Sequence, residues 1–261
     1  MKLHRIQAVL LRYLFQFRRS YDSLTDAFYW PALDLLLWGL TSKFLQDSSG
    51  SGVNILLTIL SGIIFWIIFW RAQYEITMGF LYELWNKNLV NMFVSPLKFS
   101  ECVTAWLLMG IMKGSVSFLF ACLVAFLLYK TNIFNYGLYM LPFILVLAVS
   151  AWWIGFMIAG FLMRYGVRIQ TVAWSIPWLF APFSAIYYPV STLPEWAQYI
   201  SRILPMSYVF EGMRQVMNSG TLDWNLILIA MGLNLIYLPL SMVFLKLSFN
   251  RVLKTGVTKI Y

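Results

Sequence analysis

The sequence predicts an all-α membrane protein with six transmembrane helices. Of its 261 residues, 61% are hydrophobic and only 11% are charged, and the mean hydropathy is +0.74. The apolar residues gather into runs of about 20 or more, the length at which a helix crosses a hydrocarbon layer ~30 Å thick. A soluble helix would interrupt such runs with a polar face. The expected spans are residues 27–45, 54–72, 102–129, 138–163, 170–188 and 224–245, all within one transmembrane domain that covers 1–261.

Residues 1–26 precede the first expected span and predict an amphipathic helix. Most of the lysines and arginines in this segment lie off an apolar stripe with helical spacing. The stripe consists of Leu3, Ile6, Leu10, Leu14 and Phe17. No uninterrupted apolar run with a small-residue cleavage site occurs here, so a cleavable signal peptide is not expected. We predict an interfacial helix in the lipid headgroup layer. The alternative is a cytosolic helix packed on a partner.

The distribution of Lys and Arg predicts the orientation of the chain. With the amino terminus inside, fourteen of the 19 basic residues fall in cytoplasmic segments and four fall outside, while Lys113 lies within the third span. Because basic loops favour the cytoplasmic side, both termini are expected in the cytoplasm. Residues that border the membrane account for the net charge of +9, so no nucleic-acid partner is expected.

The connection between the second and third spans carries a patterned segment at residues 81–95. Its apolar residues recur at helical spacing, and Glu83 lies on the opposite side. The apolar face includes Leu84, Trp85, Leu89 and Phe93. Ser95-Pro96 is expected to end the helix, because the residue before a proline is disfavoured in the α region. We predict a short amphipathic cytoplasmic helix that either rests on lipid or docks into a groove on a cytosolic partner.

Residues 191–222, between the fifth and sixth spans, predict two short helices. Prolines at positions 194 and 205 bound the first helix, and the second covers residues 208–218. Neither reaches about 20 apolar residues, so we expect a re-entrant hairpin that dips into the outer leaflet. Glu211 and Arg214 lie three residues apart and could pair along one helix face, in a capping or a gating role. The gate candidates are Trp196, Tyr199, Glu211 and Arg214.

Two ionisable side chains stand inside the expected spans, Asp34 in the first and Lys113 in the third. Such groups cost at least ~2.5–3.5 kcal/mol in hydrocarbon and usually find a partner. We therefore predict that Asp34 and Lys113 form a buried pair, within one chain or across a dimer. This pair could be structural or could belong to a transport pathway.

Small and aromatic residues in the spans carry weaker signals. Gly110–Gly114 and Gly155–Ala159 have the small-xxx-small spacing that favours close helix packing. Aromatic residues make up 18% of the chain and are expected first to anchor it at the membrane interfaces. An aromatic-lined pathway for sugars or flat drugs is the alternative.

The sequence contains no recognisable catalytic constellation. Cys102 and Cys122 lie ~30 Å apart along one helix and cannot bond within it. The one histidine is His4, and no phosphate-binding glycine–lysine motif occurs. We therefore expect no catalytic residue, no bound metal or cofactor, and a role in transport or structure.

Both patterned connections resemble the type-two permeases of ABC transporters. The run 81–101, with its glutamate-containing helix ending at Ser95-Pro96, resembles the coupling-helix region of that family. Residues 190–214, with Leu193-Pro194, Pro205 and the run Glu211-Gly-Met-Arg214, resemble its signature between spans five and six. The resemblance covers essentially the whole chain, including its size, six spans and amino-terminal amphipathic helix.

This resemblance implies the permease subunit of an ABC exporter in the plasma (inner) membrane. It implies a dimer of this chain with two separate ATPase subunits, and ATP and Mg²⁺ would bind only to those subunits. The residues expected to couple to the ATPase are Glu83, Leu84, Trp85, Leu89 and Phe93. The substrate would be amphipathic: a drug, a lipid or a lipid-linked glycan. Two other classes remain open from the residues, a secondary transporter with Asp34 and Lys113 as a proton relay and a non-transporting membrane scaffold.

Overall fold

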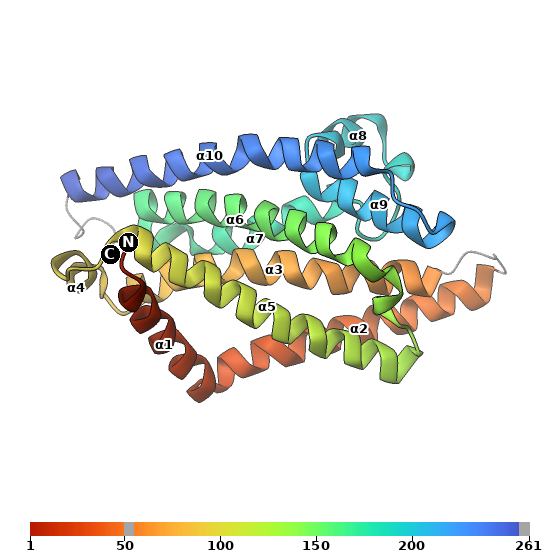
Figure 1. The fold of residues 1–261 in the computed structure, drawn as a ribbon, viewed down its shortest axis with the longest axis horizontal. Helices are drawn as coiled ribbons and strands as arrows, with labels where there is room; N and C mark the ends of the chain where they lie inside the picture. Colours follow the sequence, from red (N-terminus) through yellow and green to blue (C-terminus); the bar gives the residue numbers. More distant parts are fainter. Residues whose placement is uncertain (50–54, 256–261) are drawn as a thin grey trace.

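The computed structural model describes residues 1–49 and 55–255, and these residues form a bundle of helices (Figure 1). Five helices run along the bundle: α2 (Tyr21–Ser49), α3 (Ile55–Trp85), α5 (Phe99–Tyr129), α6 (Met140–Tyr165) and α10 (Trp224–Thr255). The shorter α-helices are α1 (Leu3–Arg19), α4 (Leu89–Val94), α7 (Gln170–Phe180), α8 (Glu195–Arg202) and α9 (Pro205–Ser219). Four 3₁₀ segments, η1 to η4, occupy Ile133–Tyr139, Gly166–Ile169, Ala181–Phe183 and Val190–Thr192.

Four helical segments in the described part of the chain are long and apolar enough to cross a membrane. They are Ile55–Trp85, Phe99–Tyr129, Ile133–Ile169 and Trp224–Lys254. They agree with the second, third, fourth and sixth expected spans, so the chain is a multi-pass membrane protein.

The first and fifth expected spans differ from this pattern. Residues 27–45 lie within α2, which is continuous but carries four aspartates and falls outside the apolar set. The prediction of a continuous helix over 170–188 is wrong, because α7 has only 11 residues, about 16 Å of helix. The chain passes into the 3₁₀ turn Ala181–Phe183, and Ala185 has a left-handed φ of 59°.

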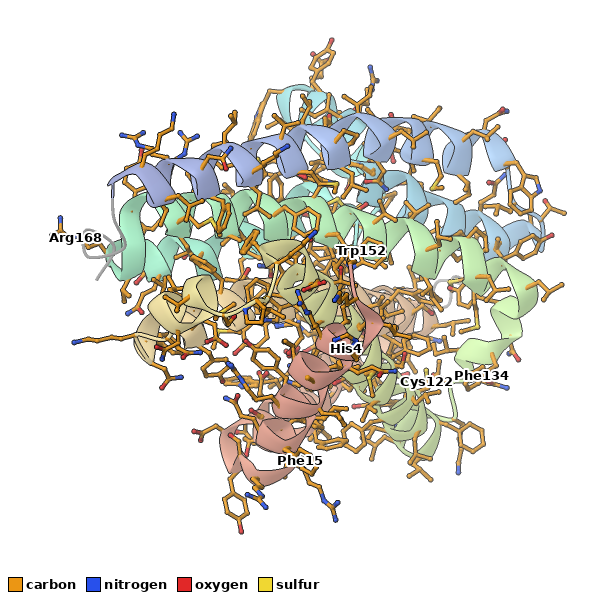
Figure 2. All side chains as sticks on the ribbon, turned by 60° about the vertical axis from the view of Figure 1, so that its left-hand side comes forward. His4, Phe15, Cys122, Phe134, Trp152 and Arg168 are labelled. Atoms are coloured by element: carbon orange, nitrogen blue, oxygen red, sulfur yellow. The ribbon has the colours of Figure 1, made fainter. Side chains whose placement is uncertain are left out.

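The amino-terminal helix is shorter than the predicted segment 1–26. It ends at Arg19 because Ser20 has an extended backbone, and residues from Tyr21 onward belong to α2. Ile6 and Tyr13 are buried where α1 packs on α5, whereas Phe15 lies on the outer side of α1 (Figure 2). The protein itself therefore covers one face of this helix.

Helix α3 is the centre of the bundle, and α2, α5 and α6 pack against it while α10 packs on α6. Close approach depends on glycine, as the small-residue spacing predicted. A Cβ added at Gly110 of α5 would lie 3.3 Å from Cα of Ala72, and one at Gly155 of α6 would lie 2.8 Å from Cδ1 of Ile76. Both glycines therefore allow neighbouring helices to approach α3 closely.

A proline in α2 is compensated by a side chain from another helix. Pro31 lacks the N–H that would bond to the carbonyl four residues earlier, that of Ala27. The Ser117 hydroxyl of α5 donates to this carbonyl at 2.9 Å. The interhelical bond satisfies a backbone group that would otherwise be unpaired in an apolar environment.

Different helices lie at the two ends of the bundle. α1, α4 and the carboxyl end of α10 lie at one end, which we call the α4 end (Figure 1). The short helices α8 and α9 lie toward the other, the α9 end. These ends and the cavity between them contain the residues that the sequence singled out.

Candidate functional site

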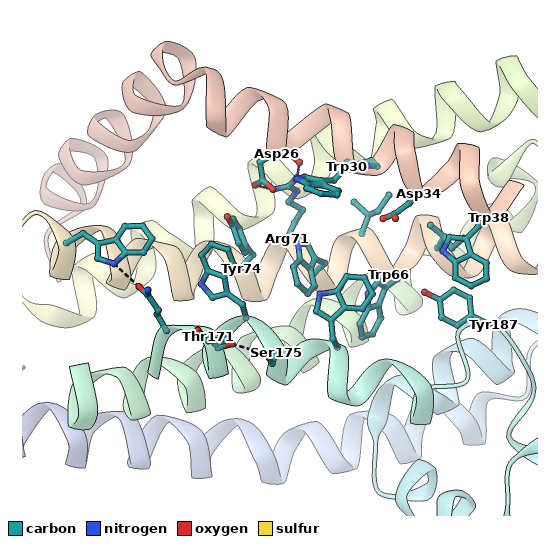
Figure 3. Close-up of a pocket in the computed structure, with 18 residues that line it drawn as sticks. Asp26, Trp30, Asp34, Trp38, Trp66, Arg71, Tyr74, Thr171, Ser175 and Tyr187 are labelled. Atoms are coloured by element: carbon teal, nitrogen blue, oxygen red, sulfur yellow. Dashed lines mark hydrogen bonds and ion pairs between the residues drawn. The ribbon is translucent and has the colours of Figure 1, made fainter. Parts of the chain in front are cut away.

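A cavity of about 790 Å³ lies between α2, α3 and α7, and tryptophan dominates its wall (Figure 3). Each helix contributes an i, i+4, i+8 row, which places three side chains on one helix face. The rows are Trp30, Asp34 and Trp38; Trp66, Trp70 and Tyr74; and Gln170, Trp174 and Trp178. This periodicity was a signal in the sequence that could have predicted the cavity. The cavity has an aromatic lining, and the pathway for sugars or flat drugs that the sequence offered as an alternative stays a prediction.

Arg71 and Asp26 form an ion pair at one side of this cavity. The guanidinium donates to both the carboxylate and the main-chain carbonyl of Asp26. Arg71, at the end of the second expected span, is one of the fourteen basic residues that we counted as cytoplasmic, but its side chain is only 2% exposed. The correction follows from the length of α3, which continues well beyond the expected end of the second span at residue 72.

The predicted pair between Asp34 and Lys113 does not form within the chain. Lys113 Nζ instead lies 2.9 and 2.8 Å from the two carboxylate oxygens of Glu75 in α3. The Phe17 ring also lies near the ammonium, 4.9 Å from it. Glu75 was missed in the sequence because the second expected span ended at residue 72, whereas α3 continues to Trp85. Asp34 remains in the cavity wall without a hydrogen bond or ion pair to any described residue.

At the α4 end, Glu83 connects three segments of the chain. Its carboxylate accepts hydrogen bonds from Arg12 and Tyr13 of α1 and from the Asn88 amide before α4. Glu83 is 1% exposed, and burial raises the pKa of Tyr13 to about 12, so the phenol remains a donor at neutral pH. These bonds hold α1 against the connection between α3 and α5.

A second buried carboxylate, Glu101, strengthens the same end. It accepts from the main-chain N–H of Lys2 at 2.7 Å and from that of Lys98 at 3.0 Å, and Arg5 lies 3.8 Å away. Glu101 therefore caps its own helix, α5, and also fixes the start of α1.

The predicted amphipathic helix at 81–95 is wrong in its bounds. Residues 81–85 are the end of α3, residues 86–88 form a turn with Lys87 at a φ of 51°, and α4 has only six residues. Glu83, Leu84 and Leu89 are each about 1% exposed, so these candidate coupling residues face the protein. Trp85 is 41% exposed and donates to Gln170 at 3.2 Å, and the side chain of Phe93 lies outside what the structure describes.

The periodicity was real, but it continued the buried face of α3. A stripe of apolar residues indicates which face is covered and not which molecule covers it. Besides Trp85, exposed side chains at this end include Asn86, Lys87, Asn91 and Val94.

At the α9 end, Glu211 and Arg214 both bond to the irregular chain after α7 and not to each other. Glu211 accepts from the Val190 N–H at 2.6 Å. Arg214 donates to the carbonyls of Ala185 and Tyr188. Burial lowers the pKa of Arg214, although the guanidinium stays charged at neutral pH. These bonds cap backbone groups of that segment, and a gating role for the two residues stays a prediction.

The other two gate candidates lie on the surface of α8. Trp196 is 62% exposed and Tyr199 is 65% exposed. Trp196 contacts the Phe183 ring edge-on at 5.9 Å, and the Arg202 guanidinium lies over the Tyr199 ring. These rings are separate from the tryptophan cavity.

The ABC-2 type transporter family model matches residues 4–218, which are most of the chain, and the chain belongs to this family. It is therefore an ABC transporter permease subunit, a transmembrane component that works with an ABC ATPase in a separate subunit. No curated protein matches the chain.

Proposed function

We propose that the chain is the permease subunit of an ABC exporter in the plasma membrane. Two copies would assemble with two ATPase subunits that hold ATP and Mg²⁺, with both termini and the α4 end in the cytoplasm. The substrate would be amphipathic and would leave at the α9 end. The observation that carries this proposal is the family match over residues 4–218.

The six-span layout is proposed with two unusual members. With 29 residues, α2 is about 43 Å long, enough to cross a bilayer even though it is less apolar than the others. α7 would cross only part of the way and continue as the irregular segment after Phe183. Irregular backbone is tolerated at membrane depth where protein satisfies its polar groups. The bonds from Glu211 and Arg214 are of this kind.

The exposed tip of the α4 end is the proposed ATPase contact. Lys87 lies in the turn between α3 and α4 and Val94, at the end of α4, is 82% exposed. Glu83 and Glu101 connect this tip to α1, α3 and α5. A push on the tip would therefore reach three helices together. In this proposal, Glu83, Leu84 and Leu89 transmit the motion from inside the protein, and Trp85 links it to α7 through Gln170.

The two other classes have less support. A proton relay would require Asp34 and Lys113 to exchange a proton, but Lys113 is held by Glu75. A non-transporting scaffold would have no need for an ATPase, whereas the family to which this chain belongs works with one. Neither class accounts for the match as directly.

Two lysines provide a matched test of ATPase docking. Lys87 and Lys130 are both exposed, both have a left-handed backbone, and they lie on opposite ends of the bundle. Lys87→Glu should reduce the amount of ATPase that copurifies by about tenfold, since a like or unpaired charge in an interface costs more than 1 kcal/mol. Lys130→Glu should leave it unchanged. Failure of any ATPase to copurify with the unaltered chain would reject the proposed assembly.

Orientation is tested by labelling introduced cysteines with an impermeant reagent. The two native cysteines, Cys102 and Cys122, are buried and should contribute little background. Thr221→Cys should react from outside intact cells, and Asn88→Cys only after permeabilisation. Reaction of Asn88→Cys in intact cells would reverse the proposed orientation.

A further inference from the structure

The cavity between α2, α3 and α7 contains one charge that the protein does not compensate. Asp34 is the fourteenth of the 29 residues of α2 and so lies near the middle of that helix. It is half-buried and has no bonded partner among the described residues. An unpaired carboxylate at that depth is unfavourable, so such groups face a partner or water.

The other two charged side chains of the cavity neutralise each other. Arg71 is paired with Asp26, two turns before Asp34 and about 12 Å away along the helix. The cavity therefore has a net charge of one negative unit, located at Asp34. A ligand that complements it must bring a positive charge to this position.

Aromatic faces surround the rest of the cavity. Trp38 stacks on Tyr187 with ring centres 4.7 Å apart, and Trp70 contacts Trp178 at 5.3 Å. Trp30 and Trp174 are 54% and 48% exposed, so their faces remain open to a ligand. Tryptophan is the ring that attracts an organic cation most strongly, and cages of aromatic rings bind quaternary ammonium groups.

Resting on the proposed export function, we propose that this cavity binds a lipophilic organic cation as the transported substrate. The positive centre would lie at Asp34, between Trp30 and Trp38, and the apolar body would pack on Trp70, Trp174 and Trp178. The volume of about 790 Å³ lies within the range of sites for drug-sized molecules. Among the amphipathic substrates, the excess carboxylate favours a cation over a neutral lipid or glycan.

Two probes of the same shape and opposite charge test the proposal. Tetraphenylphosphonium is a lipophilic cation and tetraphenylborate is the corresponding anion. We would measure their equilibrium binding to the purified full-length chain in detergent, without nucleotide. The cation should bind at least about tenfold more tightly than the anion, because charge and cation–π terms both favour it.

Variants of α2 locate the binding. Asp34→Asn should weaken cation binding by about tenfold or more, while Asp34→Glu, which keeps the charge, should retain most of it. Asp47→Asn is the matched control, because Asp47 is an exposed aspartate of the same helix outside the cavity. Trp38→Leu should weaken binding, and Trp224→Leu, on exposed α10, should not. Size-exclusion profiles would establish that each variant folds.

Three results would overturn the proposal. One is equal affinity for the two probes, and another is unchanged cation binding in Asp34→Asn. The third is a different occupant of the cavity. Binding of the neutral sugar maltoheptaose without binding of the cation would indicate a glycan, and a cross-link between two Trp30→Cys chains would indicate a second copy of this chain. Because no ATPase is needed in this assay, such a result with normal ATPase copurification would reject the cation and leave the export function standing.

Discussion

Charged side chains have different partners in the two halves of this permease subunit. All four ion pairs between described residues lie within α1–α5: Arg5–Glu101, Arg12–Glu83, Arg71–Asp26 and Lys113–Glu75. In the second half, Glu211 and Arg214 bond to main-chain groups of the segment after α7. In the first half, each of these buried charges has a charged side chain as a partner, and Arg71 and Glu101 bond to main-chain groups as well. The broken helix of the second half leaves backbone groups free, and charged side chains satisfy them.

The largest expected effect is the loss of one member of a buried ion pair. Lys113→Met leaves Glu75, which is 8% exposed, without its partner and should lower the free energy of unfolding by about 3–5 kcal/mol. The double variant with Glu75→Gln should recover much of this loss, because no charge is left unpaired. Unfolding in detergent, followed by helical circular dichroism, would measure both.

Lys246→Met is the control for this prediction, since Lys246 is an exposed lysine of α10. Its effect should stay within about 0.5 kcal/mol. If the stability losses of Lys113→Met and Glu75→Gln simply add in the double variant, the two residues do not stabilise each other. The first half would then not depend on side-chain ion pairs as stated above.

A smaller effect is expected from the backbone-capping arginine. Arg214→Met leaves the carbonyls of Ala185 and Tyr188 without their donor and should cost about 2–3 kcal/mol. No charge is left unpaired inside the protein, which is why the loss should be smaller than at Lys113. Arg202→Met, on exposed α8, should change stability little. A loss at Arg214 equal to that at Arg202 would show that the segment after α7 does not depend on this cap.

The smallest loss of stability is expected at Ser117, whose side chain caps a backbone carbonyl in the first half. Ser117→Ala removes the donor to the Ala27 carbonyl, freed by Pro31, and should cost about 1 kcal/mol. Ser115→Ala, whose hydroxyl bonds within its own helix to Ile111, is the matched control. In a Pro31→Ala background, the backbone N–H can take this role and the Ser117→Ala loss should shrink. An unchanged loss in that background would separate Ser117 from the proline.

The sequence by itself determined that the chain is helical and where its four clear spans lie, but it missed several helix ends, such as those of α3 and α7. Apolar runs were sufficient for the four clear spans, because length and hydropathy are local properties of a segment. Pro194 correctly marked the start of α8 and Pro205 the end of that helix, whereas α9 begins at Pro205, three residues before the predicted start at 208, since proline fits the first turn of a helix. The contact glycines Gly110 and Gly155 were also visible from spacing alone.

Only the tertiary structure decided the partners of the polar residues. Lys113 pairs with Glu75 and not with Asp34 because α5 packs against α3 at that position. The periodicity of one segment does not show which other segment will lie beside it. Most of the stripe at 81–85 turned inward for the same reason. Arg214 and Glu211 satisfy backbone groups of the irregular segment that follows α7, which the sequence had assigned to a continuous helix. Three rows of aromatic residues became one cavity only when α2, α3 and α7 were brought together.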